Sequence, residues 1–392
     1  FLAFTLIDEF YKSGSHVYKP NIVFKVKKGI SRNKEDANYD LLEKALLCTA
    51  QKMIPTYLLC DCESDKNIAP EKLSIMGCRT RVADDLFGKE GAVGRSNIDN
   101  ISINLPRLAL ETERDSSNEL SIENKFDLLK KKWIAVADVA TDILLDRFYK
   151  TCKSDKDLFP TNLEYNLWCE NFNANTLSDI FKHGTLSIGF IGLTEAVEVL
   201  TGKKFWKDDK AYTVAFDFVK FMRKYVDEQK NKHRLNFSLL ATSGELISGS
   251  FIAIDKQSFQ HDILTKDYYT NSFHIDVDSK LPAYKKIQLE GPFHVFANGG
   301  SITYVELSEA PIGNAVGLNE LVEIAVECGV HYLGFNFPKD VCQGCGTSGT
   351  FDVCPECGSR NIMRIRRVSG YLEIQNFFTP GKMKESLNRK TN

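Results

Sequence analysis

Four cysteines toward the carboxyl end of the chain have the spacing of a metal site. They form two Cys-x2-Cys pairs in CQGCGTSGTFDVCPECG, residues 342–358, and a glycine follows each pair directly; the four are Cys342, Cys345, Cys354 and Cys357. Two thiolates separated by two residues can point into one tetrahedral corner, and glycine allows the tight turn that aims backbone N–H groups at sulfur. Four thiolates leave no open coordination position, so the pattern predicts structural zinc, with an iron–sulfur centre or a redox dithiol as alternatives.

A glycine lies a few residues further on, in the stretch RIRRVSGYL, where Gly370 stands between a cationic run and an aromatic residue. A zinc ribbon alone is most often a nucleic-acid or protein interaction module, and Arg364, Arg366 and Arg367 would suit phosphate contacts. The other interpretation is that the metal fixes the base of a loop and so holds the glycine in one place.

Composition and charge exclude few functions. The chain has 392 residues, of which 43% are apolar and 26% charged, and this suits one large globular core with a small appendage. A formal net charge of -2 gives no general attraction to nucleic acid or anionic lipid, and no long apolar run indicates a membrane span. We therefore expect a cytoplasmic protein that binds neither membrane nor nucleic acid. The eleven cysteines are expected as metal ligands, reactive thiols or core residues rather than as a disulfide framework.

The elements that must position the cysteines and the glycine alternate between strand and helix patterns along the chain. This alternation predicts an α/β sheet or barrel. Short apolar runs typical of strands occur at residues 21–28, at 55–62, in INLPRLAL near 101, and near 185, 237 and 331. Helical spacing occurs at 39–53, 123–152 and 209–230. The face of the second helix expected to meet the core consists of Phe126, Leu129, Trp133, Val136, Val139, Ile143 and Phe148. We expect a loop or helix entry at 111–124 and a lysine-rich tail at 379–392.

The stretch after the four cysteines carries a family resemblance. RRVSGYL following a four-cysteine ribbon resembles the carboxyl terminus of the anaerobic (class III) ribonucleoside-triphosphate reductases, which are glycyl-radical enzymes. Similar stretches occur across nearly the whole chain: IVFKVKKG at 22–29, MGCR at 76–79, GRSN and INLPR within 94–107, GTLSIGFIGL at 184–193, YTNSFH at 269–274 and HYLGFNFP at 331–338. The resemblance implies the family's ten-stranded α/β barrel, incomplete here, with its first part and any nucleotide-binding regulatory domain upstream of Phe1.

The resemblance assigns radical roles to Gly370 and Cys78. Gly370 would store a radical made by a separate iron–sulfur activating enzyme that uses S-adenosylmethionine. A Cα radical is stabilised when the amide nitrogen donates and the carbonyl withdraws electron density, and the planar centre would be crowded by a side chain. Cys78, in MGCR on an expected finger loop, would form the thiyl radical that removes the ribose 3′ hydrogen. The structural alternatives are a turn glycine and a cysteine that acts as a small core hydrophobe.

Further residues are expected to contact the nucleotide or the reductant. Glu245, in LLATSGELISGSF, is similar to the glutamate of the family segment Ala-Thr-Pro-Ala-Glu and would exchange protons with the ribose hydroxyls. Asn97 and Asn104 could hydrogen-bond ribose or a one-carbon reductant. The triphosphate is expected at a glycine turn or helix N-terminus, with Gly184 and Thr185 in HGTLSIGFIGLTEA and the stretch NGGSIT at 298–303 as candidates.

The resemblance leaves the reductant open between formate and a thiol-dependent redoxin, and Asn97 beside Arg95 favours formate. Cys60 and Cys62 occupy alternate positions of a strand, which point to opposite faces, so we expect no disulfide between them. They are interpreted as core or incidental residues, together with Cys48, Cys152, Cys169 and Cys328.

Three regions are expected: a partial catalytic barrel at 1–338 with a finger loop near residue 78, a zinc ribbon at 339–363, and a glycyl-radical loop with tail at 364–392. The predicted activity is anaerobic reduction of ribonucleoside triphosphates by a homodimer under ATP or dNTP control. This fragment alone is expected to be inactive, because a partial barrel exposes strand edges. Two alternatives remain: a lyase-type glycyl-radical enzyme, expected to have adjacent cysteines at the barrel tip and no ribbon, and a non-catalytic nucleic-acid-binding zinc-ribbon protein.

Overall fold

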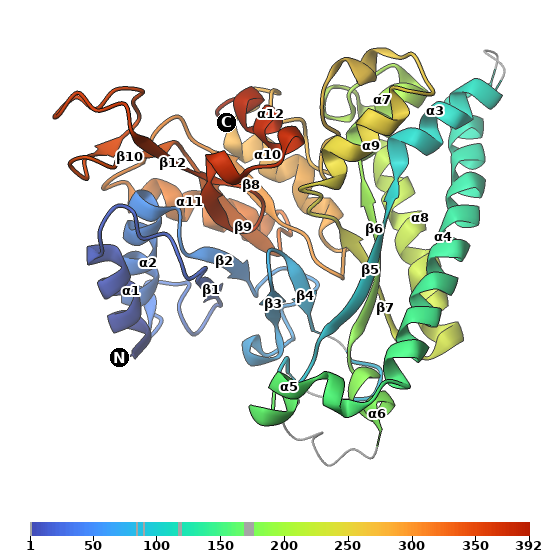
Figure 1. Cartoon of the computed structure of the whole chain (residues 1–392), viewed down its shortest axis with the longest axis horizontal. Helices are drawn as coiled ribbons and strands as arrows, with labels where there is room; N and C mark the ends of the chain where they lie inside the picture. Colours follow the sequence, from blue (N-terminus) through green and yellow to red (C-terminus); the bar gives the residue numbers. More distant parts are fainter. Residues whose placement is uncertain (1, 84, 89–90, 117–119, 168–175) are drawn as a thin grey trace.

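The computed structural model describes residues 2–83, 85–88, 91–116, 120–167 and 176–392. Two sheets stand side by side with a β-hairpin between them, and helices cover their outer faces (Figure 1). The mixed α/β class expected from the sequence is confirmed. Within the described residues the two sheets do not close into a barrel. No helix among these residues is long and apolar enough to cross a membrane.

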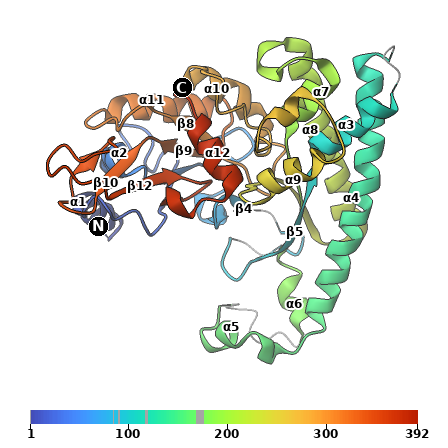
Figure 2. The ribbon, with the colours of Figure 1, turned by 45° about the horizontal axis from the view of Figure 1, so that its top comes forward.

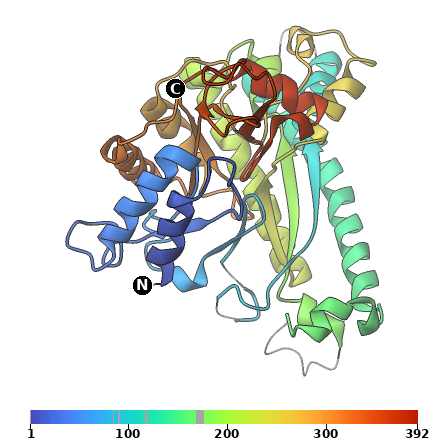
Figure 3. The same cartoon turned by 60° about the vertical axis from the view of Figure 1, so that its left-hand side comes forward.

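The first sheet has the strand order β1-β2-β9-β8 and holds the amino-terminal core. Its strands are β1 (Val23–Val26), β2 (Thr56–Leu59), β8 (Thr303–Glu306) and β9 (Tyr332–Asn336). The pairs β1–β2 and β8–β9 are parallel, whereas β2–β9 is antiparallel. The helices of this half are α1 (Leu2–Lys12), α2 (Tyr39–Lys52), α10 (Ala283–Glu290) and α11 (Ala315–Glu327). Figure 3 brings α1 and α2 to the front, beside this sheet.

The second sheet is fully parallel in the order β5-β6-β7, with β5 (Asn97–Asn104), β6 (Thr185–Ile191) and β7 (Asn236–Ala241). Large apolar side chains of β6 and β7 join those of the covering helices in the main core. These helices are α3 (Leu105–Asp115), α4 (Ile122–Cys152), α7 (Leu193–Thr201) and α8 (Asp209–His233). The long helix α4 forms the outer edge of the molecule (Figure 1).

The remaining helices and strands lie outside these two sheets. They are β3 (Ser74–Met76), β4 (Thr80–Val82), α5 (Pro160–Glu164), α6 (Leu177–Phe181), α9 (Ile247–Asp255), β10 (Lys339–Cys342), β11 (Ser348–Gly349), β12 (Ile362–Arg367), β13 (Leu372–Ile374) and α12 (Pro380–Asn388). Strands β11-β10-β12-β13 form a third, antiparallel sheet.

Two details of the sequence prediction were wrong. The run INLPRLAL is a strand only as far as Asn104, because the Asn104 side chain accepts a hydrogen bond from the Arg107 backbone N–H and starts α3. On α4, Val136, Val139 and Ile143 are exposed by 40%, 58% and 39%, although the rest of the predicted face is buried. Ala137, Ala140 and Leu144 face the core in their place.

The lysine-rich tail contains a docked helix. Lys382 on α12 is buried, and its Nζ donates to a Glu385 carboxylate oxygen at 2.5 Å. Helix α12 packs beside α9 (Figure 2), where a Cβ added at Gly381 would lie 2.8 Å from the Cα of Gly249. The two helices cross at a pair of glycines, and this allows α12 to pack closely against α9, the helix that follows β7.

Candidate active site and metal centre

Cys78 lies at the tip of the hairpin formed by β3 and β4. Gly77 precedes it with φ +57°, in the left-handed region that glycine adopts without strain. The Cys78 side chain is half-buried, and its Sγ lies 3.0 Å from the Oγ of Ser243, which follows β7. The thiol is therefore placed over the carboxyl end of β7.

Arg79 is buried and ties this turn to both sheets. Its Nη1 donates to the Ala241 carbonyl at 3.3 Å, and its Nη2 donates to the Tyr304 hydroxyl at 2.8 Å. The same Nη1 is 3.4 Å from Nε2 of His274. Since Ala241 ends β7 and Tyr304 lies in β8, the backbone at Cys78 is held from two sides.

Gly370 lies in the turn between β12 and β13, where the Val368 N–H donates to the Tyr371 carbonyl at 3.0 Å. The turn continues the strand that leaves the four-cysteine ribbon. Arg367, the last residue of β12, donates from Nη1 to the Gly370 carbonyl at 3.2 Å. The ribbon and the glycine turn thus share one antiparallel sheet.

The two turns meet at Gly370. A Cβ added there would lie 1.6 Å from the Cys78 carbonyl oxygen and 2.6 Å from the Cys78 Cα, whereas real Cβ atoms essentially never approach within 3.0 Å. The structure therefore brings together two residues that are 292 positions apart in the chain, and it requires glycine at position 370 for steric reasons alone. No other described glycine has a shorter contact of this kind.

Glu245 lies under the glycine turn and contacts the residues on both sides of Gly370. One carboxylate oxygen accepts from the Ser369 hydroxyl at 2.8 Å and the other from the Tyr371 hydroxyl at 2.9 Å. The Glu245 carbonyl also accepts from the Thr379 hydroxyl at 2.7 Å, just before α12. Glu245 is therefore placed within the cluster of Cys78 and Gly370, as an acceptor at both oxygens.

The other predicted binding residues lie elsewhere on the β5-β6-β7 sheet. The Thr185 hydroxyl donates to Asn97 at 3.1 Å, and a Cβ at Gly184 would lie 2.5 Å from Ile98, so these residues pack at the amino ends of β5 and β6. Cys78 lies at the opposite, carboxyl end of the neighbouring strand.

Asn104 is engaged in structural contacts. Its side-chain oxygen caps α3, and its Nδ2 donates to the Asp255 carboxylate at 2.8 Å. The structure thus gathers Cys78, Glu245 and Gly370, and it does not bring the two asparagines to them.

A row of small polar side chains connects the two ends of this sheet, and the sequence analysis missed it. Ser187 and Ser238 are hydrogen-bonded across β6 and β7 at 2.9 Å, and Ser102 reaches Thr242 at 2.7 Å. The second pair meets over Gly189, where a Cβ would lie 2.2 Å from the Thr242 hydroxyl. The signal was a period of two in TLSIGFI and NFSLLAT, in which small or polar residues recur at every second position and are interrupted by Ile191 and Leu240.

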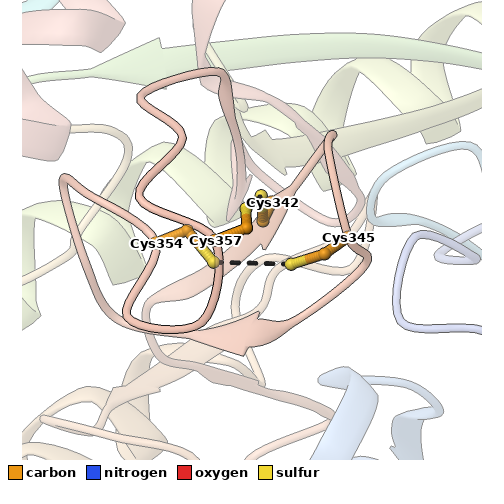
Figure 4. Close-up of side chains that lie close together, drawn as sticks. All are labelled: Cys342, Cys345, Cys354 and Cys357. Atoms are coloured by element: carbon orange, nitrogen blue, oxygen red, sulfur yellow. Dashed lines mark hydrogen bonds between the residues drawn. The ribbon is translucent and has the colours of Figure 1, made fainter.

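The four cysteines form one cluster, as their spacing predicted. Their sulfur atoms all lie within 4.8 Å of one another, and two pairs, Cys342 with Cys357 and Cys345 with Cys354, are 3.5 Å apart (Figure 4). Thiolates about 2.3 Å from a tetrahedral metal ion are separated by a little under 4 Å, so the cluster fits such an ion. Each glycine that follows a pair has positive φ, +79° and +69°, and closes the turn with an N–H bond to Cys342 or Cys354 carbonyl oxygen.

The arginines of the basic run beside the ribbon are paired or buried. Arg364 pairs with Asp352 at 2.6 Å, and Arg366 pairs with Asp340 at 2.7 Å. Arg367 is buried. These contacts weaken the case for a nucleic-acid-binding module.

The other cysteines lie outside this cluster. Cys48, Cys60 and Cys62 are buried free thiols, and burial raises the pKa of Cys48 to about 11 and that of Cys60 to about 12. Such thiols are inert core residues. Cys152 and Cys328 are half-buried and free, and Cys169 lies outside the described residues.

Comparisons with known proteins agree with this arrangement. The family model of the anaerobic ribonucleoside-triphosphate reductases matches residues 4–391. The chain is 31% identical over 385 residues to the anaerobic ribonucleoside-triphosphate reductase of Escherichia coli and 29% identical over 384 residues to that of Haemophilus influenzae. Each alignment covers 93% of this chain and 52% of the relative, so the chain spans about half the length of these curated relatives.

Solved structures share the fold at low sequence identity. The anaerobic ribonucleotide reductase from Thermotoga maritima in complex with dATP and CTP superposes with a TM-score of 0.70 at 15% identity, covering 98% of this chain and 59% of that one. The B12-independent glycerol dehydratase from Clostridium butyricum superposes with a TM-score of 0.61 at 12% identity, covering 95% and 52%. With the family model matched over nearly all its length, this chain belongs to the anaerobic ribonucleoside-triphosphate reductase family.

Proposed function

We propose that this chain supplies the radical residues of an enzyme that reduces ribonucleoside triphosphates to 2′-deoxyribonucleoside triphosphates without oxygen. The observation that carries the proposal is the packing of Gly370 against the backbone of Cys78, which leaves no space for a side chain at position 370. Hydrogen-atom transfer needs the reacting atoms close together, and this packing puts the Gly370 Cα beside the residue that carries the thiol.

The proposed reaction passes one hydrogen atom at a time. Cys78 gives the hydrogen of its S–H bond to the Cα radical of Gly370, so that a Cα–H bond forms and the unpaired electron moves to sulfur. The Cys78 thiyl then breaks the ribose C3′–H bond and regains its S–H bond. The 2′ hydroxyl leaves as water, which takes up one proton, and the 3′ hydroxyl gives one up. Glu245 would exchange these protons, and its hydrogen bonds to Ser369 and Tyr371, which put it beside Gly370, support this role.

Formate is the proposed reductant: replacing the 2′ hydroxyl by hydrogen takes up two electrons, which formate would supply as it is oxidised to carbon dioxide. Cys78 would then return a hydrogen atom to C3′, and the thiyl so formed would regenerate the Gly370 radical. The nucleotide would lie along the row of small polar side chains between Thr185 and Thr242, because hydroxyl groups there can exchange hydrogen bonds with it. Asn97, Asn104, Gly184 and Thr185 remain predicted ligands at the ends of this row.

Zinc is the proposed ion for the four cysteines, because four thiolates in a closed tetrahedral set suit it. Its proposed role is structural: β10 and β12 leave the cluster directly and carry the turn that holds Gly370. The proposed regions are the barrel portion at 1–338, the ribbon at 339–363, and the radical loop and tail at 364–392.

The proposed partners follow from the same site and from α4. An iron–sulfur activating enzyme that uses S-adenosylmethionine would form the radical, and ATP or dNTP would act as effectors. The exposed apolar row Val136, Val139 and Ile143 supports a homodimer, since apolar side chains aligned on one helix face gain from burial against a second copy. A cytoplasmic location is proposed.

Two observations favour this function over the alternatives. Cys78 stands between Gly77 and Arg79, without the adjacent second cysteine expected of a lyase-type enzyme. The pairing of Arg364 and Arg366 with aspartates speaks against a nucleic-acid-binding ribbon.

Electron paramagnetic resonance tests the proposal. The complete protein would be incubated without oxygen with its activating enzyme, a reductant and S-adenosylmethionine, beside Gly370→Ala and Cys78→Ser variants. We expect a doublet in the wild type and in Cys78→Ser but not in Gly370→Ala, with deoxyribonucleotide formed by the wild type alone. A silent wild type, with zinc bound and an activating enzyme proven on another substrate, would refute the radical function.

A further inference from the structure

Arg367 differs from the other two arginines of β12 in its environment. Residues alternate between the two faces of a strand, so Arg364 and Arg366 lie on one face and Arg367 on the other. The first two pair with Asp352 and Asp340. Arg367 is 1% exposed and lies beneath the glycine turn.

All the hydrogen bonds that the structure describes for the Arg367 guanidinium go to uncharged oxygens. Nε donates to the Phe335 carbonyl at 3.0 Å and Nη2 to the Met53 carbonyl at 2.6 Å. Nη1 lies 3.4 Å from the Thr56 hydroxyl and donates to the Gly370 carbonyl at 3.2 Å. Within the glycine turn, the described hydrogen bonds of the guanidinium therefore reach only the carbonyl of Gly370.

A buried cation that contacts no carboxylate is costly, because its hydration is lost without a counter-charge. Burial accordingly lowers the pKa of Arg367, while Tyr304, Tyr332 and Glu306 nearby oppose that change. A neutral residue of similar length could bond some of the same carbonyls at a lower cost. The charge itself therefore calls for an explanation beyond packing.

We infer that Arg367 tunes the stability of the radical at Gly370 through its charged hydrogen bond to the Gly370 carbonyl. This inference rests on the proposed function. The unpaired electron of a glycyl radical spreads from Cα onto the carbonyl oxygen, and this spread grows when a cation draws electron density toward that oxygen. Arg367 would thus lower the energy of the Gly370 radical relative to the Cys78 thiyl and hold the carbonyl in the plane that delocalisation requires.

The test uses the complete, activated protein and three variants. Arg367→Gln removes the charge, Arg367→Lys keeps it without the fork of donors, and Arg366→Gln makes the same change on the opposite face of β12. The measurements are the yield and lifetime of the glycyl-radical signal, the splitting of its doublet, and electron–nuclear double resonance of protein grown with ¹⁵N-arginine. Melting temperature and zinc content serve as checks on folding.

We expect a ¹⁵N coupling to the radical in the wild type and in Arg366→Gln that is lost in Arg367→Lys. Because a charged hydrogen bond is stronger than a neutral one, the radical lifetime should fall by about tenfold in Arg367→Gln, recover in part in Arg367→Lys and stay unchanged in Arg366→Gln. The doublet splitting should change only in the variants at 367.

The inference is overturned if the wild-type radical has no ¹⁵N-arginine coupling, or if Arg367→Gln keeps the wild-type lifetime and splitting. The wild-type coupling decides the matter even if Arg367→Gln does not fold. A wild type that forms no radical at all would instead overturn the proposed function, so the two failures are distinguishable.

Discussion

The contact between Gly370 and Cys78 can be tested in this chain without any radical chemistry. In Gly370→Ala the new Cβ would start 1.6 Å from the Cys78 carbonyl oxygen, and the shortest separation that real Cβ atoms show is about 3.0 Å. One of the two turns must therefore move by about 1.4 Å or more. The atom in the way belongs to the backbone, so no side-chain rotation can relieve the clash.

This displacement breaks the hydrogen bonds that join the turns to the segment after β7. Glu245 would lose its bonds from Ser369 and Tyr371, and Cys78 its contact with Ser243. At about 1 kcal/mol each, the free energy of unfolding should fall by about 2 to 3 kcal/mol. For a chain of this length unfolding as one unit, that corresponds to a melting temperature lower by about 3 °C.

The assay combines scanning calorimetry with the rate at which a maleimide labels Cys78, followed by peptide mass spectrometry. We expect Cys78 to label faster in Gly370→Ala, because the glycine turn no longer covers it. Ser369→Ala is the matched control: it removes one hydrogen bond and adds no atom, so it should cost about 1 kcal/mol and change the labelling of Cys78 little. If Gly370→Ala melts and labels like the wild type, the two turns do not pack against each other at Gly370.

Three further predictions concern other parts of the molecule. Cys354→Ser should release the bound metal, measured by atomic emission, and speed maleimide labelling of Cys78, because the ribbon holds the glycine turn. Val139→Glu should shift a dimer toward monomer in analytical ultracentrifugation, since the charge would lie in the apolar row of α4. Burial alone would raise the pKa of Glu290, but His274, Lys286 and hydrogen bonds hold it to about 2. The charged Glu290 carboxylate therefore contributes to the free energy of unfolding above about pH 4.3, and this contribution is lost as the pH falls from there toward 2. In Glu290→Gln the free energy of unfolding, measured at a series of pH values, should depend less on pH over that window.

The elements with strong local signals could be predicted from the sequence. The helices predicted at 39–53, 123–152 and 209–230 match α2, α4 and α8 closely, because apolar residues at helical spacing over so many residues fit a helix and not a strand. The cysteine cluster was equally predictable, since a Cys-x2-Cys pair closes its turn locally. The prediction was wrong at residues 105–110 and on the exposed face of α4. A cap at Asn104 ended the strand there, and small alanines rather than valines met the core on α4.

The sequence by itself determined that a ribbon precedes a glycine turn and that a lone cysteine stands on a loop, because both are properties of short segments. Only the tertiary structure decided that these turns touch, that Glu245 bonds to both neighbours of Gly370, and that Arg367 lies beneath it. It also separated Asn97 and Thr185 from Cys78. The physical reason is that such contacts join residues far apart in the chain, and the packing of two sheets around one hairpin fixes which of them meet.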